Sequence, residues 1–546
     1  MSEPSPAPAP AKPATGGSIK ETFESIVIAF ILAFVFRAYV VEAFVIPTGS
    51  MAPTLLGEHY GVVCDQCGYR FPVDGPEAGY RSADPAVCPM CHYPNPRPAR
   101  SPRSAGDRIL VHKYVYAFTE PRRWDVVVFK APHQPDMNYI KRLVGLPQEK
   151  LAIVEGNVYV LPDGPGATQP WRIARKSENL KAQRAVWQPV YHSEYVPLDG
   201  GADAPGRGRY RWKNPWVSPH GFEWLGRRGW RYDPAYEPGA AGEGVLQFDW
   251  SASAAGGPGL FPYNQLKPDN AASVVPVEDV RLAAIVLPEG PGLTLHLSTT
   301  ARLNGGESQP LVARITPDGK CTLLTVAAGT VGGVLTPLEG LEPAQVEPWS
   351  PGHARSVELW YVDQEALLWV DGRRVLQWSY DLPGGRELDG SPLVTRAAPP
   401  VRPTLRIEAS GAPVTLERIE LDRDIYYTPN VLTNGSPGWG IIEKRPSSAR
   451  GFWGEPVQLG ADEFFCMGDN SPHSLDSRLW DKVEPWIRQR YFASDDPHPQ
   501  GVVPRRLMIG RAFFVYFPAP LRWSPDSPAF VPGGRVPDFG RMRFIH

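Results

Sequence analysis

One stretch decides the fold: Phe44-Val45-Ile46-Pro47-Thr48-Gly49-Ser50-Met51-Ala52-Pro53-Thr54-Leu55. It places a serine between a glycine and a methionine, with a proline on either side of that group. Proline fixes the backbone angle φ, so the stretch predicts a stiff turn that can hold the Ser50 hydroxyl exposed. Most serines in such turns only form the turn. The other segments of the chain therefore have to show whether Ser50 is a nucleophile.

The composition predicts a folded, mainly β protein of several domains. The chain has 546 residues, enough for two to four domains, and its net charge of -2 gives no electrostatic basis for binding nucleic acid. Its 62 prolines, 53 glycines and 17 tryptophans favour short strands and turns over long helices. Six cysteines in a chain of this length do not make a disulfide scaffold.

The N-terminal region predicts a disordered tail and a membrane anchor. Residues 1–18 are rich in Pro, Ala, Gly and Ser, which is typical of disorder. An apolar run, Ser25–Phe36, continues past Arg37 to Ile46, and a helix from Phe23 to Ile46 would be about 36 Å long, enough to span a bilayer. We predict a retained transmembrane anchor over residues 19–46. A signal-peptide core or a buried helix are the alternatives for the uncharged part alone.

Two Cys-x-x-Cys pairs follow the serine stretch, Cys64/Cys67 and Cys88/Cys91. This spacing suits a tetrahedral thiolate site for zinc, in which all four ligands are protein and the metal is structural. Two local disulfides or free thiols are the alternatives. We predict a zinc-ribbon-like insertion over residues 60–98.

A lysine stands among bulky apolar residues in a block of predicted strands. Strands are expected at 107–113 and 124–130, and Lys141 lies in the similar stretch 139–147. Burial disfavours the ammonium form, so an enclosed Lys141 can act as a general base near neutral pH. A surface lysine beside Arg142 is the alternative.

A polar loop follows a later apolar strand, within residues 464–480. Asp476 and Arg478 are placed for a local ion pair, and the hydroxyl of Ser474 can bond a nearby amine. Residues 507–517 predict a closing strand.

In their order, these blocks resemble the bacterial type I signal peptidases. The resemblance covers roughly 40% of the chain and lies in five segments: the anchor leading into 46–55, 125–130, 139–147, 468–478 and 510–512. It departs from the family at Ser471-Pro472-His473. A Ser–His mechanism through His473 is disfavoured, because Lys141 matches the base of the family.

The resemblance implies a membrane-bound serine endopeptidase that removes signal peptides from exported preproteins after Ala-x-Ala sites. Ser50 would be the nucleophile and Lys141 the general base, with no catalytic cofactor. Thr48 and the Ser50 amide would stabilise the oxyanion, and Ser474 would orient the lysine. Asp476 and Arg478 would form a structural ion pair. Apolar pockets for small side chains would be lined by Ile46, Met51, Leu55, Tyr139 and Ile140.

The resemblance also sets the predicted domain boundaries. The catalytic domain is expected to be discontinuous, over 47–162 and 424–520, with a C-terminal tail at 521–546. The insertion between its parts has an unassigned segment, 163–280, and a segment of alternating strands, 281–423. Strands are expected at 293–297, 311–315, 357–362, 366–376 and 405–408, and their turns indicate an antiparallel β-sandwich that weakly resembles concanavalin-like lectins.

Two alternatives to the peptidase remain at this stage. One is a catalytically inactive, membrane-tethered binding protein that uses the sandwich to hold a glycan or peptide, although a spacer role suits the sandwich better. The other, a self-cleaving repressor, lacks an evident DNA-binding segment. We favour the peptidase, with signal peptides and the lipid bilayer as partners. Its catalytic domain is expected on the extracytoplasmic side of the cytoplasmic membrane.

Overall fold

The computed structural model describes residues 19–74, 86–95, 103–197, 212–235, 242–251, 277–303, 308–326, 334–381, 402–428, 431–432, 441–442, 456–492, 500–518, 521–522, 535–536 and 539–546. The predicted disordered tail, 1–18, lies outside this part. The described chain is mainly β, as the composition predicts. Its α-helices are α1 (Ile19–Tyr39), α2 (Val115–Phe118), α3 (Leu180–Val186) and α4 (Pro485–Tyr491).

Lys141 lies in an antiparallel sheet, and the Ser50 turn follows one of its edge strands; we call it the catalytic sheet after these two predicted catalytic residues. Its strand order is β1-β7-β34-β8-β9-β32-β33, and β37 pairs with β34 in addition. These strands are β1 (Val41–Val45), β7 (Arg108–Lys113), β8 (Val126–Ala131), β9 (Gln134–Gly145), β32 (Glu463–Met467), β33 (Val503–Pro504), β34 (Met508–Phe517) and β37 (Arg543–Phe544). The strands predicted at 107–113, 124–130, 139–147 and 507–517 are confirmed.

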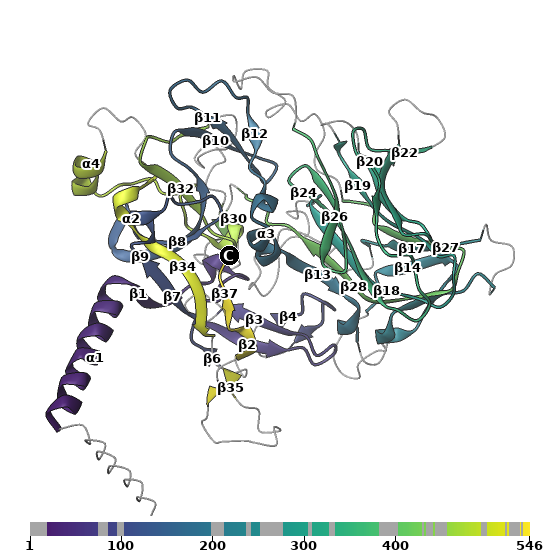
Figure 1. The fold of residues 1–546 in the computed structure, drawn as a ribbon, viewed down its shortest axis with the longest axis horizontal. Helices are drawn as coiled ribbons and strands as arrows, with labels where there is room; N and C mark the ends of the chain where they lie inside the picture. Colours follow the sequence, from purple (N-terminus) through teal and green to yellow (C-terminus); the bar gives the residue numbers. More distant parts are fainter. Residues whose placement is uncertain are drawn as a thin grey trace, which may run out of the picture.

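Helix α1 is shorter than the predicted anchor. It ends at Tyr39, and the apolar residues that follow form β1, which pairs with β7 in the register Val41↔His112. The prediction of one helix through to Ile46 is wrong, because these β-branched and aromatic residues find a partner strand. Among the described residues, no helix has both the length and the apolar character needed to cross a membrane. In Figure 1, α1 projects away from the catalytic sheet.

A smaller sheet lies beside the catalytic sheet and shares its core. Its order is β12-β11-β10-β31, from β10 (Glu149–Val154), β11 (Asn157–Pro162), β12 (Arg172–Ile173) and β31 (Val457–Gln458). One buried cluster joins Val127 and Phe465 of the catalytic sheet to Leu151 and Val160 of the smaller one. This shared core packs against β9, the strand that carries Lys141.

The C-terminal residues complete the catalytic domain. Phe544 pairs with Phe514 of β34, and the Ile545 amide donates to the Phe513 carbonyl at 2.9 Å. Ile545 is buried in a cluster with Ile46 and Met51. The last residues of the predicted tail, 521–546, are therefore a packed part of the domain, because they supply an edge strand and an apolar side chain.

The insertion contains two larger antiparallel sheets. The docking sheet, which faces the catalytic domain, has the order β15-β16-β28-β18-β24-β25-β26, with β13 paired to β28. Its strands are β13 (Gln188–His192), β15 (Phe222–Trp224), β16 (Trp230–Tyr232), β18 (Val280–Pro288), β24 (Arg355–Val362), β25 (Glu365–Val370), β26 (Arg373–Ser379) and β28 (Val414–Arg423).

The distal sheet lies on the far side of the docking sheet (Figure 1). Its order is β14-β17-β27-β19-β20-β21-β22, with β23 paired to β21. Its strands are β14 (Trp216–His220), β17 (Glu243–Phe248), β19 (Thr294–Ala301), β20 (Gln309–Ile315), β21 (Lys320–Val326), β22 (Leu335–Pro337), β23 (Ala344–Gln345) and β27 (Arg406–Ser410).

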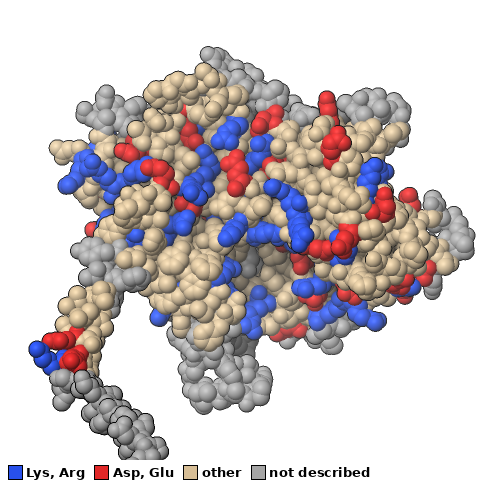
Figure 2. Space-filling model, in the orientation of Figure 1, with Lys and Arg blue, Asp and Glu red and all other residues tan. Residues whose placement is uncertain are grey.

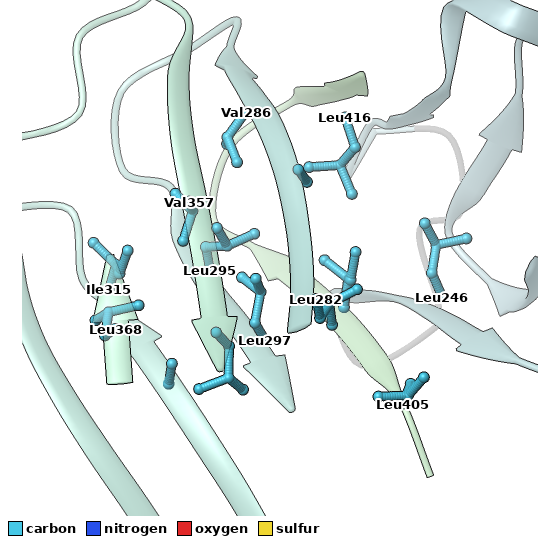
Figure 3. Packing of buried hydrophobic residues seen from close by; sticks show 14 of the residues in the cluster. Leu246, Leu282, Val286, Leu295, Leu297, Ile315, Val357, Leu368, Leu405 and Leu416 are labelled. Carbon is cyan, nitrogen blue, oxygen red and sulfur yellow. The ribbon is translucent and has the colours of Figure 1, made fainter. Parts of the chain in front are cut away.

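The two sheets share one apolar core (Figure 3). Leu282 and Val357 of the docking sheet and Leu295 and Leu297 of the distal sheet are all completely buried in it. Strands form in each of the five stretches predicted from alternation. Five further strands, β13 to β17, come from the segment 163–280 that the sequence left unassigned, and they extend both sheets. Membership of the concanavalin-like class stays a prediction.

The four clustered cysteines lie in the turns of two hairpins, which belong to two small sheets. One has the order β3-β2-β6 and the other is the hairpin β4-β5. The strands are β2 (His59–Val63), β3 (Arg70–Asp74), β4 (Ala86–Val87), β5 (Pro94–Asn95) and β6 (Arg103–Ser104). Two more strand pairs complete the described chain: β29 (Val431–Leu432) with β30 (Ile441–Ile442), and β35 (Leu521–Arg522) with β36 (Arg535–Val536).

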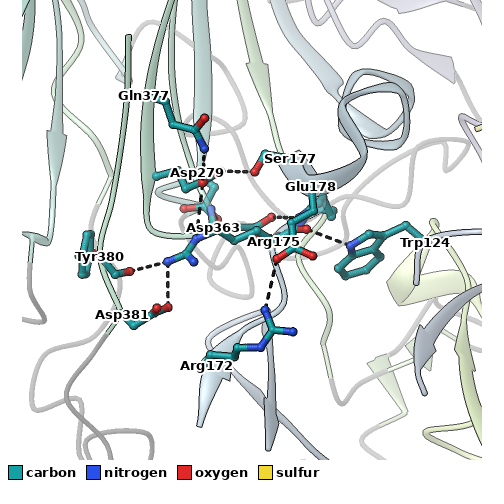
Figure 4. A network of polar contacts seen from close by, with 12 residues as sticks. Trp124, Arg172, Arg175, Ser177, Glu178, Asp279, Asp363, Gln377, Tyr380 and Asp381 are labelled. Carbon is teal, nitrogen blue, oxygen red and sulfur yellow. Dashed lines mark hydrogen bonds and ion pairs between the residues drawn. The ribbon is translucent and has the colours of Figure 1, made fainter. Parts of the chain in front are cut away.

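A polar network joins the insertion to the catalytic domain (Figure 4). The Arg175 guanidinium bonds Asp381 at 2.8 Å, while the Trp124 indole donates to the Arg175 carbonyl at 3.1 Å. Lys176 is buried between Asp363 and Asp424, with its Nζ at 2.6 and 2.9 Å from their carboxylates. On the face shown in Figure 2, charges of both signs are interspersed, in keeping with the small net charge.

Candidate active site

Ser50 lies in a one-turn 3-10 helix, Gly49–Met51, that follows the extended residue Thr48. The turn closes through the Ala52 amide, which donates to the Gly49 carbonyl at 3.0 Å. Only 7% of Ser50 is exposed. The predicted stiff turn is therefore present, but it holds the hydroxyl in a nearly enclosed position rather than an exposed one, because the catalytic sheet and a later loop both pack against it.

Lys141 reaches the Ser50 hydroxyl from strand β9. Its ammonium nitrogen Nζ lies 2.8 Å from Ser50 Oγ and 3.0 Å from the Ile140 carbonyl oxygen. The side chain is 2% exposed, and in the described part of the chain it makes no ion pair. Two residues 91 positions apart are thus brought to hydrogen-bond distance. The surface-lysine alternative is wrong.

Burial lowers the pKa of Lys141 into the range of a general base. Removal from water lowers the pKa of Lys141 to about 8, although the nearby Asp476, Cys466 and Asp469 act in the opposite direction. An amine with this pKa is partly neutral near pH 8 and can accept the proton of a hydroxyl group.

The loop that follows β32 also holds the serine turn, through two hydrogen bonds from Asn470. The Asn470 amide donates to the Ser50 carbonyl at 3.0 Å, and its side-chain Nδ2 donates to the Gly49 carbonyl at 3.1 Å. Beside it, Asp469 makes a bidentate pair with Arg142 at 2.7 Å and accepts a bond from the Thr54 hydroxyl. Asp469 and Asn470 lie in the stretch 468–478 that carries the family resemblance, but no role was predicted for them. The partners named here lie more than 300 residues away along the chain, so no local pattern reveals them.

Asp476 and Arg478 form the predicted ion pair, completely buried and bidentate at 2.7 and 2.8 Å. Asp476 also accepts the Gly468 amide at 2.9 Å, so the pair shapes the loop that reaches the serine. A Cβ atom at Gly468 would lie 2.2 Å from Ser474 Oγ and 2.5 Å from the Ser50 carbonyl oxygen. Only glycine fits between these two serines.

Ser474 is buried beside the dyad, but its predicted bond to the lysine is not formed here. Among the described residues, Ser474 Oγ has no hydrogen-bond partner. Thr48 Oγ1, in contrast, lies 3.5 Å from Ser50 Oγ, on the edge of hydrogen-bond distance. The structure thus gathers all four hydroxyl- and amine-bearing candidates, Thr48, Ser50, Lys141 and Ser474, at one place.

The predicted pocket residues fall into two groups. Ile46, Met51, Leu55 and Ile140 share one buried cluster next to the serine turn. Tyr139 packs instead with the ring of Trp480, at a centroid distance of 6.1 Å, and its own ring lies 5.2 Å from Lys141 Nζ. Neighbouring residues of a strand point to opposite faces, which places Tyr139 and Ile140 on different sides of β9.

The four cysteine sulfurs converge into one cluster. Their Sγ atoms all lie within 4.8 Å of one another, with 3.5 Å between Cys64 and Cys91 and 3.6 Å between Cys67 and Cys88. A disulfide needs about 2.05 Å, whereas four sulfurs around one zinc at about 2.3 Å would be about 3.8 Å apart. The Cys64 and Cys88 amides each bond the carbonyl five residues ahead at 2.9 Å, so the two knuckles are alike. The donor set and spacing fit a zinc ion.

Three segments of the chain, residues 19–77, 96–198 and 440–517, match the family described as "Signal peptidase, peptidase S26". Ser50, Lys141 and Ser474 each fall within a different one of these segments. The second segment ends at residue 198, beyond residue 162, the predicted end of the first part of the catalytic domain.

The named relatives with similar sequences include signal peptidases I of Rickettsia species. Signal peptidase I of Rickettsia typhi is 29% identical over 146 residues, which are 27% of this chain and 45% of that protein. Signal peptidase I of Rickettsia bellii is 26% identical over 140 residues, 26% of this chain and 39% of that protein. The chain thus spans less than half the length of the curated relatives that it matches.

Some solved structures are similar to part of the chain at low scores. Carbohydrate-binding module CBM66 from Bacillus subtilis covers 38% of this chain and 95% of its own, at 8% identity and a TM-score of 0.23. A Bacillus subtilis protein of unknown function with a galectin-like fold covers 43% and 96%, at 10% identity and a TM-score of 0.25.

Proposed function

We propose that the chain is a serine endopeptidase that cleaves signal peptides from exported preproteins, because three of its segments match the peptidase S26 family and the named relatives are signal peptidases I. One observation carries the proposal. The buried amine of Lys141 lies 2.8 Å from the hydroxyl of Ser50, in a segment order that the family shares.

In the proposed reaction Ser50 is the nucleophile and Lys141 the general base. The neutral amine takes the proton of Ser50 Oγ while this oxygen attacks the scissile carbonyl carbon. The resulting ammonium returns the proton to the leaving amine, and a water molecule then hydrolyses the acyl-enzyme with the same base. A lysine serves here because burial keeps its pKa close to the working pH.

Thr48 and the Ser50 amide are proposed to stabilise the oxyanion. The position of Thr48 Oγ1, 3.5 Å from the nucleophile, supports this role. Specificity for small residues before the cut is proposed to come from Ile46, Met51, Leu55 and Ile140. These four residues form an apolar cluster next to the serine turn, which supports a preference for apolar side chains there. Ser474 is proposed to orient the amine once substrate is bound.

The Cys64, Cys67, Cys88 and Cys91 cluster is proposed to hold a structural zinc ion. We expect about one zinc per chain by elemental analysis of the purified protein. Replacing Cys88 by Ser should remove the metal and destabilise this module, whereas Cys321→Ser, a buried thiol in the sandwich core, should leave the metal content unchanged. A folded protein without metal and without titratable thiols would show disulfides instead.

The bilayer is proposed as a partner, with the catalytic domain on the extracytoplasmic side of the cytoplasmic membrane. Helix α1 supports contact with lipid, because its apolar side chains are exposed, Phe23 by 66% and Phe34 by 65%. Its C-terminal end leads through β1 directly to the serine turn. This link would keep the site close to a lipid-held substrate.

Cleavage of a preprotein with an Ala-x-Ala site tests the proposed function. Detergent-purified wild type should cut it, and Ser50→Ala should not, while Ser298→Ala in the distal sheet should cut like wild type. Equal cleavage by Ser50→Ala and wild type would contradict the mechanism. No cleavage by well-folded wild type would favour the tethered binding protein.

A further inference from the structure

A small polar cavity lies where the insertion meets the catalytic domain. Its volume is about 20 Å³, which suffices for a single water molecule or ion. Glu155 and Asn157, at the turn between β10 and β11, line it from the catalytic domain. The insertion contributes Asp279, just before β18, and Gln364, in the turn between β24 and β25.

Gln364 offers an oxygen atom that no described residue hydrogen-bonds. The residue is only 2% exposed, and its amide nitrogen donates to the Tyr159 hydroxyl at 2.7 Å. Its carbonyl Oε1 is buried and, among the described residues, has no hydrogen-bond partner. Such an oxygen is costly to bury unless a donor or a cation meets it.

Acidic groups outnumber basic groups around this cavity. Carboxylate oxygens of Asp279, Asp363 and Asp424 lie within 4.8 Å of one another. Lys176 pairs with two of them, Asp363 and Asp424, but makes no ion pair with Asp279 among the described residues.

Two arginines supply the remaining positive charges. Arg302 bridges Glu155 and Glu278, each at 2.8 Å, and Arg423 lies at the Asp424 carbonyl, 3.2 Å away. Of the residues that line the cavity, Glu155, Glu278 and Asp279 carry a carboxylate and Arg302 alone is basic, so the lining has a formal net charge of -2.

We propose that the cavity binds one hard divalent cation of the calcium type, held by the Asp279 carboxylate and Gln364 Oε1, with Asn157 and Glu155 opposite. Oxygen-only ligands and a double negative charge suit Ca²⁺. Mg²⁺ is disfavoured, because it keeps several water molecules that a space of about 20 Å³ does not admit. The ion would tie the insertion to the β10–β11 turn. This inference does not depend on the proposed peptidase activity.

Terbium, which replaces calcium and emits when a nearby tyrosine is excited, tests the site, because Tyr361 and Tyr426 line the cavity. The full chain, dialysed against metal-free buffer, should bind one Tb³⁺ that calcium displaces, and calcium should raise its melting temperature. Asp279→Asn should weaken Tb³⁺ binding at least tenfold. Asp318→Asn, a change in an exposed turn of the distal sheet, should leave binding unchanged.

A second variant distinguishes a bound cation from the alternative content of the cavity, which is one water molecule beside a protonated Asp279. Gln364→Glu adds a ligand charge, so it should tighten Tb³⁺ binding and make the melting temperature more dependent on calcium. If Gln364→Glu only lowers the melting temperature, with no response to calcium, the proposal is wrong. The absence of calcium-displaceable Tb³⁺ from folded wild type would overturn it as well.

Discussion

Two lysines are buried at two places in this molecule, and they behave in opposite ways. Lys141 in the catalytic sheet is 2% exposed and Lys176 at the junction with the insertion is 3% exposed. Each Nζ also lies over an aromatic ring, at 5.2 Å from Tyr139 and 5.3 Å from Trp124. Burial and ring contact are therefore the same in both regions.

The partners of the amines make the difference. Lys141 faces a hydroxyl and a carbonyl oxygen, so burial prevails and its pKa falls to about 8. For Lys176 burial acts in the same direction, but Asp363 and Asp424 outweigh it and raise its pKa well above the ordinary value. A buried lysine becomes a base only where no carboxylate pairs with it. The first lysine is therefore the one that we propose as a general base, and the second forms buried ion pairs.

Replacing Lys141 should remove activity without harming the fold. We expect Lys141→Met to lower kcat/KM roughly 10²–10⁴-fold, because the general base is lost. Its free energy of unfolding at pH 7 should rise by up to about 3 kcal/mol, since the folded chain no longer holds a charge that burial disfavours. Cleavage assays and urea denaturation measure the two effects, with Lys130→Met on β8 as the control. A large loss of stability would show that Lys141 is structural.

Replacing Lys176 should have the reverse effect. Lys176→Met leaves Asp363 and Asp424 buried without their cation, which should lower the free energy of unfolding by about 3–5 kcal/mol. Activity of the folded fraction should stay within a few-fold of wild type. Lys181→Met, an exposed lysine on α3, should change stability by no more than about 0.5 kcal/mol. Equal stability of Lys176→Met and wild type would show that the ion pairs of Lys176 do not stabilise the fold.

The pH dependence should also separate the two lysines. The pKa of about 8 predicts that kcat/KM rises roughly tenfold per pH unit below pH 8 and levels off above it. Stability should increase with pH from about 8 towards 10.5, because only the unfolded chain keeps the Lys141 proton there. Lys176 stabilises the fold while it is charged, throughout this range. A rate that is flat from pH 6 to 9 would contradict the lysine base.

The sequence predicted those features that depend on residues close to one another in the chain. The turn around Ser50, the strand of Lys141 and the ion pair of Asp476 with Arg478 all follow from short motifs. Lys176 gives no such signal, because it stands in the run Arg175-Lys176-Ser177, which is typical of a surface, and its partners lie 187 and 248 positions away. The loss of helix after Tyr39 escaped prediction for the same reason, since pairing with β7 decides it.

The segment 188–248 shows a second limit of local patterns. Its strands are as short as Phe222–Trp224, and the segment is rich in glycine, so alternation has too few residues to be recognised. They become strands because β28 and β27 offer edges to pair with. Tertiary pairing overrides weak local preference here.

The discontinuous catalytic sheet has a consequence for synthesis. Leu143 of β9 pairs with Cys466 of β32, 323 residues later. At about 5–20 residues per second, a ribosome needs roughly 16–65 seconds to make the chain between them. During this interval β9 lacks its neighbour on that side, and Ser50 lacks the Asn470 clamp. The catalytic sheet therefore stays incomplete until the insertion has been made, and a chain arrested within the insertion would carry Ser50 and Lys141 in an incomplete site.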